Sequence, residues 1–168
     1  MTQSYIIAVI VEHRPGVLYR VSNMFRRRGF NIESITVGPT EASDLARMTI
    51  TVNGDEALVE QVIKQLQKLI EVVKVSKLEP METVVRELAL IKVHTPDSKV
   101  RSDVVTYVDI FRGRVVDVSH ESITAEVTGT TDKIDAFIEL MRAFGVKEVA
   151  RTGITALGRG LKSVRVEA

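Results

Sequence analysis

Two spacings of apolar residues alternate along the first half of the chain and predict its strands and helices. An apolar run from Tyr5 to Val11 predicts a strand over 4–12, and Pro15-Gly16 follows as a turn. Apolar side chains then recur with the spacing of one buried helical face, at Val17, Leu18, Val21, Met24 and Phe25. This stripe predicts a helix over 16–28.

The same two patterns predict four further elements in this half. Strands are expected over 30–38, 45–53 and 70–78, and a helix over 55–69, with Asn53-Gly54-Asp55 supplying the turn and a cap before it. The order is then strand, helix, strand, strand, helix, strand. With right-handed crossovers it closes most easily as a four-stranded antiparallel sheet with both helices on one face, the ferredoxin-like arrangement.

The second half repeats this cycle after a short interruption at Pro80. Strands or a hairpin are expected at Val84–His94, Arg114–Val118, Ile123–Val127 and Val146–Thr155, with helical stripes at Val100–Phe111 and Ile134–Phe144. The prediction is an α+β protein of two tandem ferredoxin-like βαββαβ units, with domains at 1–78 and 84–168, a linker at 79–83, and a flexible tail around Gly158-Arg159-Gly160.

Composition narrows the classes of partner. The 168 residues contain 23 Lys and Arg against 22 Asp and Glu, a formal net charge of +1, so no bulk field favours nucleic acid or an anionic membrane. Cysteine is absent, which excludes disulfides, thiolate metal sites and a Cys nucleophile. No apolar run approaches the roughly 20 residues of a membrane span, and no signal peptide is recognisable. A soluble cytoplasmic protein is expected.

No catalytic or metal site is predicted. His13, His94 and His120 lie far apart in sequence, without the i, i+4 spacing typical of a metal-binding helix. No nucleophile, base and orienting group can be assembled, so the chain is not expected to be an enzyme. RNA-binding units of this topology stack bases on sheet aromatics, but the third strand, Leu45–Val52, has none. No nucleic-acid partner is therefore expected.

One turn is a candidate ligand site. Gly16 allows close approach to the first N–H groups of the helix, where the positive end of its dipole would suit a small carboxylate. Asn31 offers both a donor and an acceptor to a zwitterionic amino acid. Alternatively, the two residues are only an economical turn and a strand entry. The second half has Pro96-Asp97-Ser98 at the corresponding place, where an acidic side chain would repel a carboxylate, so the site is assigned to the first half.

The basic run Arg26-Arg27-Arg28 ends the first helix. Cations there complement the helix dipole, and their side chains can reach the last carbonyls. Contact with a partner or with nucleic acid is the other interpretation.

The chain resembles a known family over essentially its whole length. The matching segments are Pro15–Val21, Phe25–Val37, Ala46–Ile50, Val85–Val93, Ile110–Gly113 and Glu148–Gly153. They closely resemble the regulatory small subunit of acetohydroxyacid synthase, also called acetolactate synthase. The resemblance implies an N-terminal ACT domain, a C-terminal ACT-like domain and a homodimer.

The resemblance also implies a function. Members of the family bind the catalytic large subunit of this branched-chain amino-acid biosynthetic enzyme, raise its activity and confer feedback inhibition by valine. Thiamine diphosphate, magnesium and flavin belong to the catalytic partner, and no cofactor is expected on this chain. The alternative is a stand-alone amino-acid-binding ACT protein that regulates another enzyme or a transcription factor.

The family's effector site carries over to six residues. Gly16 with the N–H groups of Val17 and Leu18 would receive the valine carboxylate, while Asn31 and Ile32 would approach from the neighbouring protomer. The family often has Asn at the position of His13. A neutral imidazole there can still hydrogen-bond the ligand.

Overall fold

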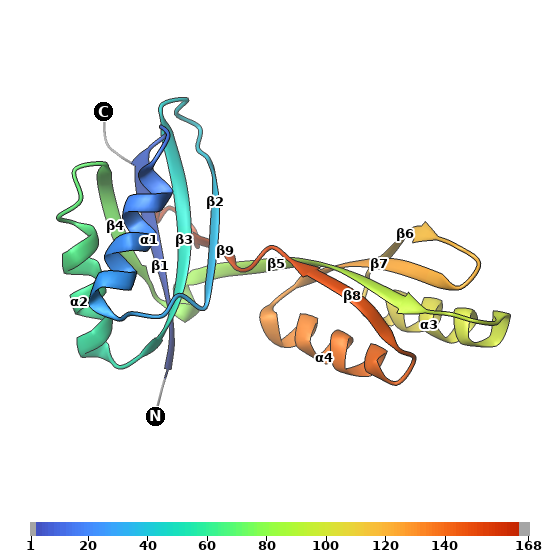
Figure 1. Cartoon of the computed structure of the whole chain (residues 1–168). Coiled ribbons are helices and arrows are strands. Elements are labelled where there is room, and N and C mark those ends of the chain that lie inside the picture. Colours follow the sequence, from blue (N-terminus) through green and yellow to red (C-terminus); the bar gives the residue numbers. More distant parts are fainter. Residues whose placement is uncertain (1–2, 165–168) are drawn as a thin grey trace. The chain divides into compact units, whose positions relative to one another are not determined.

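The chain forms two compact units, shown in Figure 1. The structure is a computed structural model that describes residues 3–164. Of these, residues 3–84 and 154–164 belong to the first unit, and residues 85–153 belong to the second.

The first unit has the predicted ferredoxin-like topology. Its elements are β1 (Gln3–Glu12), α1 (Val17–Arg28), β2 (Ser34–Pro39), β3 (Leu45–Gly54), α2 (Glu56–Leu66) and β4 (Val72–Leu78). The four strands are antiparallel in the order β2-β3-β1-β4, and both helices cover one face of the sheet (Figure 1). The predicted order of elements is confirmed.

Two element ends differ from the prediction for local reasons. Gly29 adopts a left-handed conformation with φ 68°, and the N–H of Phe30 returns to the carbonyl of Phe25 at 3.0 Å. This closure ends α1, so β2 begins at Ser34 rather than at residue 30. Helix α2 ends at Leu66 rather than at residue 69. The N–H groups of Lys68 and Leu69 bond to carbonyls three residues earlier, as in Leu69 to Leu66 at 3.1 Å, instead of four residues earlier as in an α-helix.

The second unit repeats the topology. A short 3-10 helix, η1 (Pro80–Glu82), occupies the predicted linker. It is followed by β5 (Thr83–His94), α3 (Ser98–Ile110), β6 (Arg114–Val118), β7 (Ser122–Gly129), α4 (Thr131–Arg142) and β8 (Val146–Arg151). The last strand, β9 (Thr155–Gly158), lies in the segment that belongs to the first unit. The sheet order is β6-β7-β5-β8, and β9 pairs with β5. The expected tandem arrangement of two such units is confirmed.

Each unit has its own hydrophobic core. In the first, the alternate residues Ile7, Val9 and Val11 of β1 face the helices and pack with side chains that include Phe25 and Leu66. In the second, the corresponding strand and helices contribute a separate cluster, made of Ala89, Ile91, Val93, Val104, Val108, Ile123, Ala125, Val127, Ile134, Phe137 and Met141. The predicted stripes therefore point inward.

The C-terminal segment returns to the first unit. The pattern predicts one domain over 84–168, whereas residues 154–164 pack with residues 3–84. The carbonyl of Ile154 accepts a hydrogen bond from Thr36 Oγ1 at 2.9 Å, and the N–H of Arg159 donates to the carbonyl of Glu82 at 2.7 Å. Residues 155–159 thus make defined contacts, contrary to the predicted flexible tail.

Candidate functional site

The turn between β1 and α1 leaves the start of α1 open. Gly16 is the N-cap residue, with φ 86° and ψ −10°, a left-handed conformation that glycine adopts without strain. Apart from Gly16 and its two chain neighbours, no described atom lies within 4 Å of the position that a Cβ at Gly16 would occupy. The turn therefore has both the backbone conformation and the free space that a ligand close to the main chain requires.

The first N–H groups of α1 have no side-chain cap. Helices α2 and α3 begin after Asp55 and Asp97, whose carboxylates accept a hydrogen bond from the N–H three residues later, at 2.8 and 2.9 Å. At Gly16 no side chain of the described chain takes this role, and the first turn of α1 contains no acidic residue. Uncapped N–H groups and the positive end of the helix dipole are together suited to receiving an anion.

A buried carboxylate anchors both flanks of this turn. The Glu71 side chain is 5% exposed, and its Oε1 lies 3.0 Å from Arg20 Nη1 and 3.5 Å from Arg14 Nη2. Its backbone carbonyl also accepts the N–H of Glu12 at 2.9 Å. Sequence reasoning missed Glu71, because one acidic residue before an apolar strand gives no sign of its partners.

The other predicted residues on this side lie around the turn. The His13 side chain is exposed, while its backbone N–H donates to the carbonyl of Asp44 at 2.8 Å. Val17 is buried at 4%, so it can offer a ligand only its N–H, whereas Leu18 is 48% exposed. Within one chain, therefore, His13, Gly16, Val17 and Leu18 lie together.

Asn31 and Ile32 are at the opposite end of α1. The helix has 12 residues, which at 1.5 Å per residue separates its two ends by about 18 Å. The Asn31 amide donates to Glu33 Oε1 at 2.6 Å. A single chain does not bring these two residues to Gly16.

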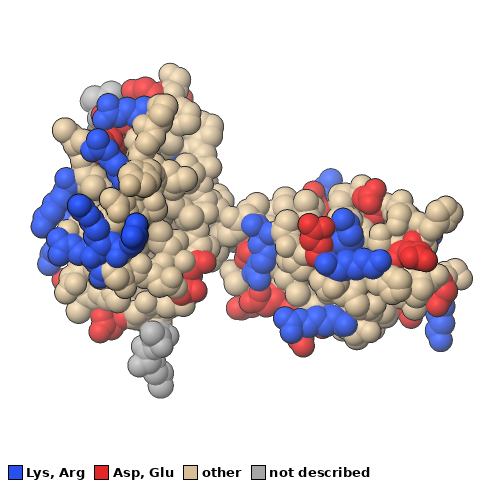
Figure 2. Space-filling view, viewed as in Figure 1, with Lys and Arg blue, Asp and Glu red and all other residues tan. Residues whose placement is uncertain are grey.

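A basic groove begins at the turn and follows α1 and the end of α2. It has a volume of about 720 Å³, and Pro15 and Gly16 contribute to its wall. Four of its lining side chains are cationic, namely Arg20, Arg27, Arg28 and Lys68. Figure 2 shows Lys and Arg gathered over these helices of the first unit. The total charge of the chain did not indicate this local concentration.

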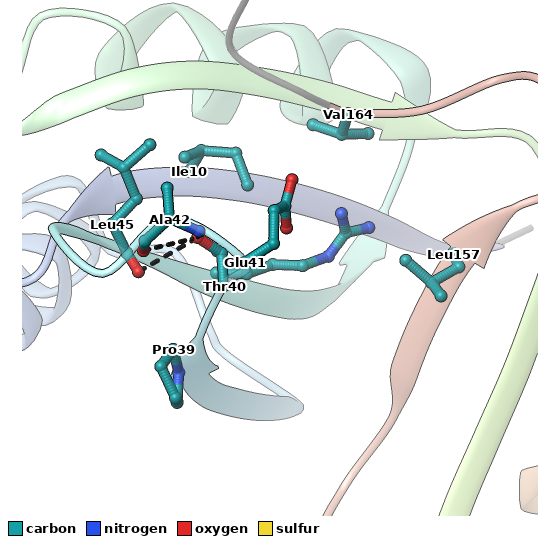
Figure 3. A pocket seen from close by; sticks show the side chains of 9 residues that line it. Ile10, Pro39, Thr40, Glu41, Ala42, Leu45, Leu157 and Val164 are labelled. Atoms are coloured by element: carbon teal, nitrogen blue, oxygen red, sulfur yellow. Dashed lines mark hydrogen bonds between the residues drawn. The ribbon is translucent and has the colours of Figure 1, made fainter.

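A second hollow lies on the other face of the same sheet (Figure 3). It has a volume of about 260 Å³ and is lined by apolar side chains that include Ile10, Leu45 and Leu157, with Arg47 among them. Arg47 Nη2 donates to the carbonyl of Ala156 at 2.7 Å, and burial lowers the pKa of this guanidinium. Arg47 thereby fastens the C-terminal segment to the sheet, which makes this hollow a structural feature.

The described residues contain neither a metal-binding cluster nor a membrane-spanning helix. Within residues 3–164, no group of three or more His, Asp or Glu side chains is arranged to hold a metal ion. No helix in this range is long and apolar enough to cross a membrane.

Both units match models of known families. Residues 7–74 match the AHAS small subunit-like ACT domain, and residues 86–160 match the small subunit of acetolactate synthase. Together with the repeated ferredoxin-like topology, these matches define a protein of two tandem ACT-type units.

Individual relatives extend the match to nearly the full length. The chain is 60% identical over 156 residues to a probable acetolactate synthase small subunit of Archaeoglobus fulgidus, covering 93% of this chain and 97% of that protein. It is 56% identical over 161 residues to the corresponding Methanothermobacter thermautotrophicus protein, covering 96% of each. The crystal structure of the acetolactate synthase small subunit from Thermotoga maritima matches with a TM-score of 0.88 and 44% identity, covering 94% of this chain and 98% of that one. The chain belongs to the acetolactate synthase small-subunit family, which confirms the resemblance seen in its sequence.

Proposed function

We propose that this chain is the non-catalytic regulatory subunit of an acetolactate synthase. It binds the catalytic large subunit, raises its activity and makes it sensitive to inhibition by valine. Family membership supports the partnership, because the relatives are named as small subunits of that enzyme. The observation that carries the effector role is the uncapped start of α1 at Gly16, which is open to an anion.

The proposed ligand is a free branched-chain amino acid with its carboxylate at this helix start. The N–H groups of Val17 and Leu18 receive the carboxylate, and His13 lies beside it. Such a contact contributes at most about 2 kcal/mol. A sensor with a Kd between roughly 10 μM and 1 mM needs about 4 to 7 kcal/mol of binding free energy. The remainder has to come from enclosing the isopropyl group and pairing the ammonium group.

A second protomer supplies that enclosure in the proposed assembly. Asn31 and Ile32 are about 18 Å from Gly16 along α1, so they serve the site of a neighbouring copy in a homodimer. A ligand held between two protomers changes the free energy of their arrangement, which provides coupling to the catalytic subunit. Thiamine diphosphate, magnesium and flavin are placed on that subunit, and this chain binds none of them.

Reconstitution tests the regulatory role. The purified chain alone is expected to form no acetolactate from pyruvate, to raise the rate of the purified catalytic subunit when mixed with it, and to make that rate fall on addition of valine. Calorimetry of the chain with valine, leucine and isoleucine tests the effector site separately. Stimulation without heat from any of the three ligands would remove the sensor role and keep the partnership, whereas no stimulation would remove the partnership.

A further inference from the structure

The basic groove along α1 contains cations that nothing in the described chain neutralises. Arg20 pairs with Glu71 at 3.0 Å. In contrast, the side chains of Arg27, Arg28 and Lys68 form no ion pair or hydrogen bond with any residue that the structure describes between positions 3 and 164. Three free positive charges therefore line one groove of a chain whose formal net charge is +1.

Backbone N–H groups, not arginine side chains, bond to the carbonyls of Phe25 and Arg26 at the end of α1. The N–H of Gly29 donates to the carbonyl of Arg26 at 3.2 Å, and the N–H of Phe30 donates to that of Phe25 at 3.0 Å. These backbone bonds satisfy carbonyls that basic side chains could have reached. The structure therefore does not show the predicted hydrogen bonds from basic side chains to the last carbonyls of α1.

The rest of the groove combines polar and apolar surface. Tyr19 is 71% exposed, and Leu69, Asn23 and Gln65 contribute further wall. Tyrosine and arginine are enriched in protein interfaces, where an aromatic side chain gives contact area and a guanidinium pairs with carboxylates. The 12 residues of α1 give the groove a length of about 18 Å. This length suits a few turns of helix or several extended residues better than a single small anion.

We propose that this groove receives an acidic segment of the catalytic subunit. The proposal rests on the proposed function, because it names the surface through which that partner is bound. Carboxylates of the segment pair with Arg27, Arg28 and Lys68, and an apolar residue packs against Tyr19. Because Pro15 and Gly16 line the groove, a segment bound there would lie next to the turn that is proposed to bind the effector.

The test compares two charge reversals that change the net charge equally. The first variant, Arg27→Glu with Lys68→Glu, changes the groove. The control, Arg26→Glu with Lys99→Glu, changes exposed cations that do not line it, and Arg26 shares the last turn of α1, so the penalty at the helix end is matched. Affinity for the purified catalytic subunit and stimulation of acetolactate formation are measured at about 50 mM and about 500 mM salt.

The groove variant is expected to bind the catalytic subunit about tenfold more weakly at low salt, with the difference shrinking at high salt. The control should bind nearly as well as the unmodified chain. Equal binding by both variants, or an equal loss in both, would overturn the groove as the docking site while wild-type stimulation still upheld the regulatory function. A wild-type chain that neither binds nor stimulates the catalytic subunit would overturn both proposals. Valine calorimetry and thermal unfolding of each variant report whether the first unit is intact.

Discussion

Arg20 Nη1 lies 3.0 Å from Oε1 of Glu71, a carboxylate whose side chain is 5% exposed. The two residues are far apart in sequence, and their pairing joins the second turn of α1 to the chain just before β4. Arg14 is the second cation on the same oxygen, at 3.5 Å. The Pro15-Gly16 turn is therefore flanked by two arginines that share one buried acid.

We expect Arg20→Met to lower the free energy of unfolding by about 1 to 2 kcal/mol, because Glu71 then stays buried with its weaker partner alone. Arg20 is 60% exposed at its side chain, which keeps the effect below that of a fully buried pair. Urea unfolding measures the change. The double variant Arg20→Met with Glu71→Gln should recover part of the loss, and a double variant no better than the sum of the single ones would contradict this account.

Replacing Gly16 tests the anion site at the start of α1. Gly16→Asp is expected to abolish valine binding in calorimetry, because its carboxylate occupies the place of the ligand's carboxylate and repels it. The matched control is Gly16→Asn, which has nearly the same shape, is neutral and tolerates a positive φ. Valine binding that is lost equally in both variants would point to bulk or strain rather than charge.

Mixing protomers tests whether the site spans two chains. Gly16→Asp and Asn31→Ala homodimers are each expected to bind valine poorly. A hybrid dimer joins the unmodified turn of one protomer to the unmodified Asn31 of the other, so one of its two sites is intact. Unfolding and refolding the mixture should restore about half of the wild-type binding capacity in the hybrid fraction. Hybrids that remain inactive would show that both residues act within one chain, whereas an Asn31→Ala homodimer that binds valine normally would show that Asn31 does not contact the ligand.

Removing the Arg47 side chain should loosen the C-terminal segment. Its Nη2 donates to the carbonyl of Ala156 at 2.7 Å, so Arg47→Ala is expected to cost about 1 to 2 kcal/mol of stability. Limited proteolysis should cut within 154–164 faster than in the unmodified protein. The control Arg159→Ala leaves backbone bonds in place, since that residue contacts Glu82 through its N–H. A segment cut equally fast in both variants would argue against the role of Arg47.

Much of the fold could be predicted because apolar spacing reports local structure directly. The stripe from Val17 to Phe25 identifies α1 and its buried face within a few residues. The contrast between Gly16 and Asp97 could also be seen, because a helix start depends on its own residues. In the structure Asp97 caps α3, whereas α1 begins without a side-chain cap.

Features built from distant residues could not be predicted in the same way. Glu71 and Arg20 meet only because α1 and the start of β4 are brought together by the sheet. The groove gathers Lys68 beside Arg27 and Arg28 from two helical regions, and the total charge hides it. The return of residues 154–164 to the first unit depends on bonds such as that between Thr36 and Ile154, which no local pattern indicates.

The path of the chain makes the second unit an insertion into the first. Ala8 and Ile10, 0% and 3% exposed, lie on the face of β1 opposite the helices, where the sheet also meets the segment held by Arg47. A protein cut short after Val84 would lack that segment and leave apolar sheet surface facing water, with aggregation as the risk. An independently folding first unit would instead be made by deleting residues 85–153 and bridging the gap with a short flexible peptide.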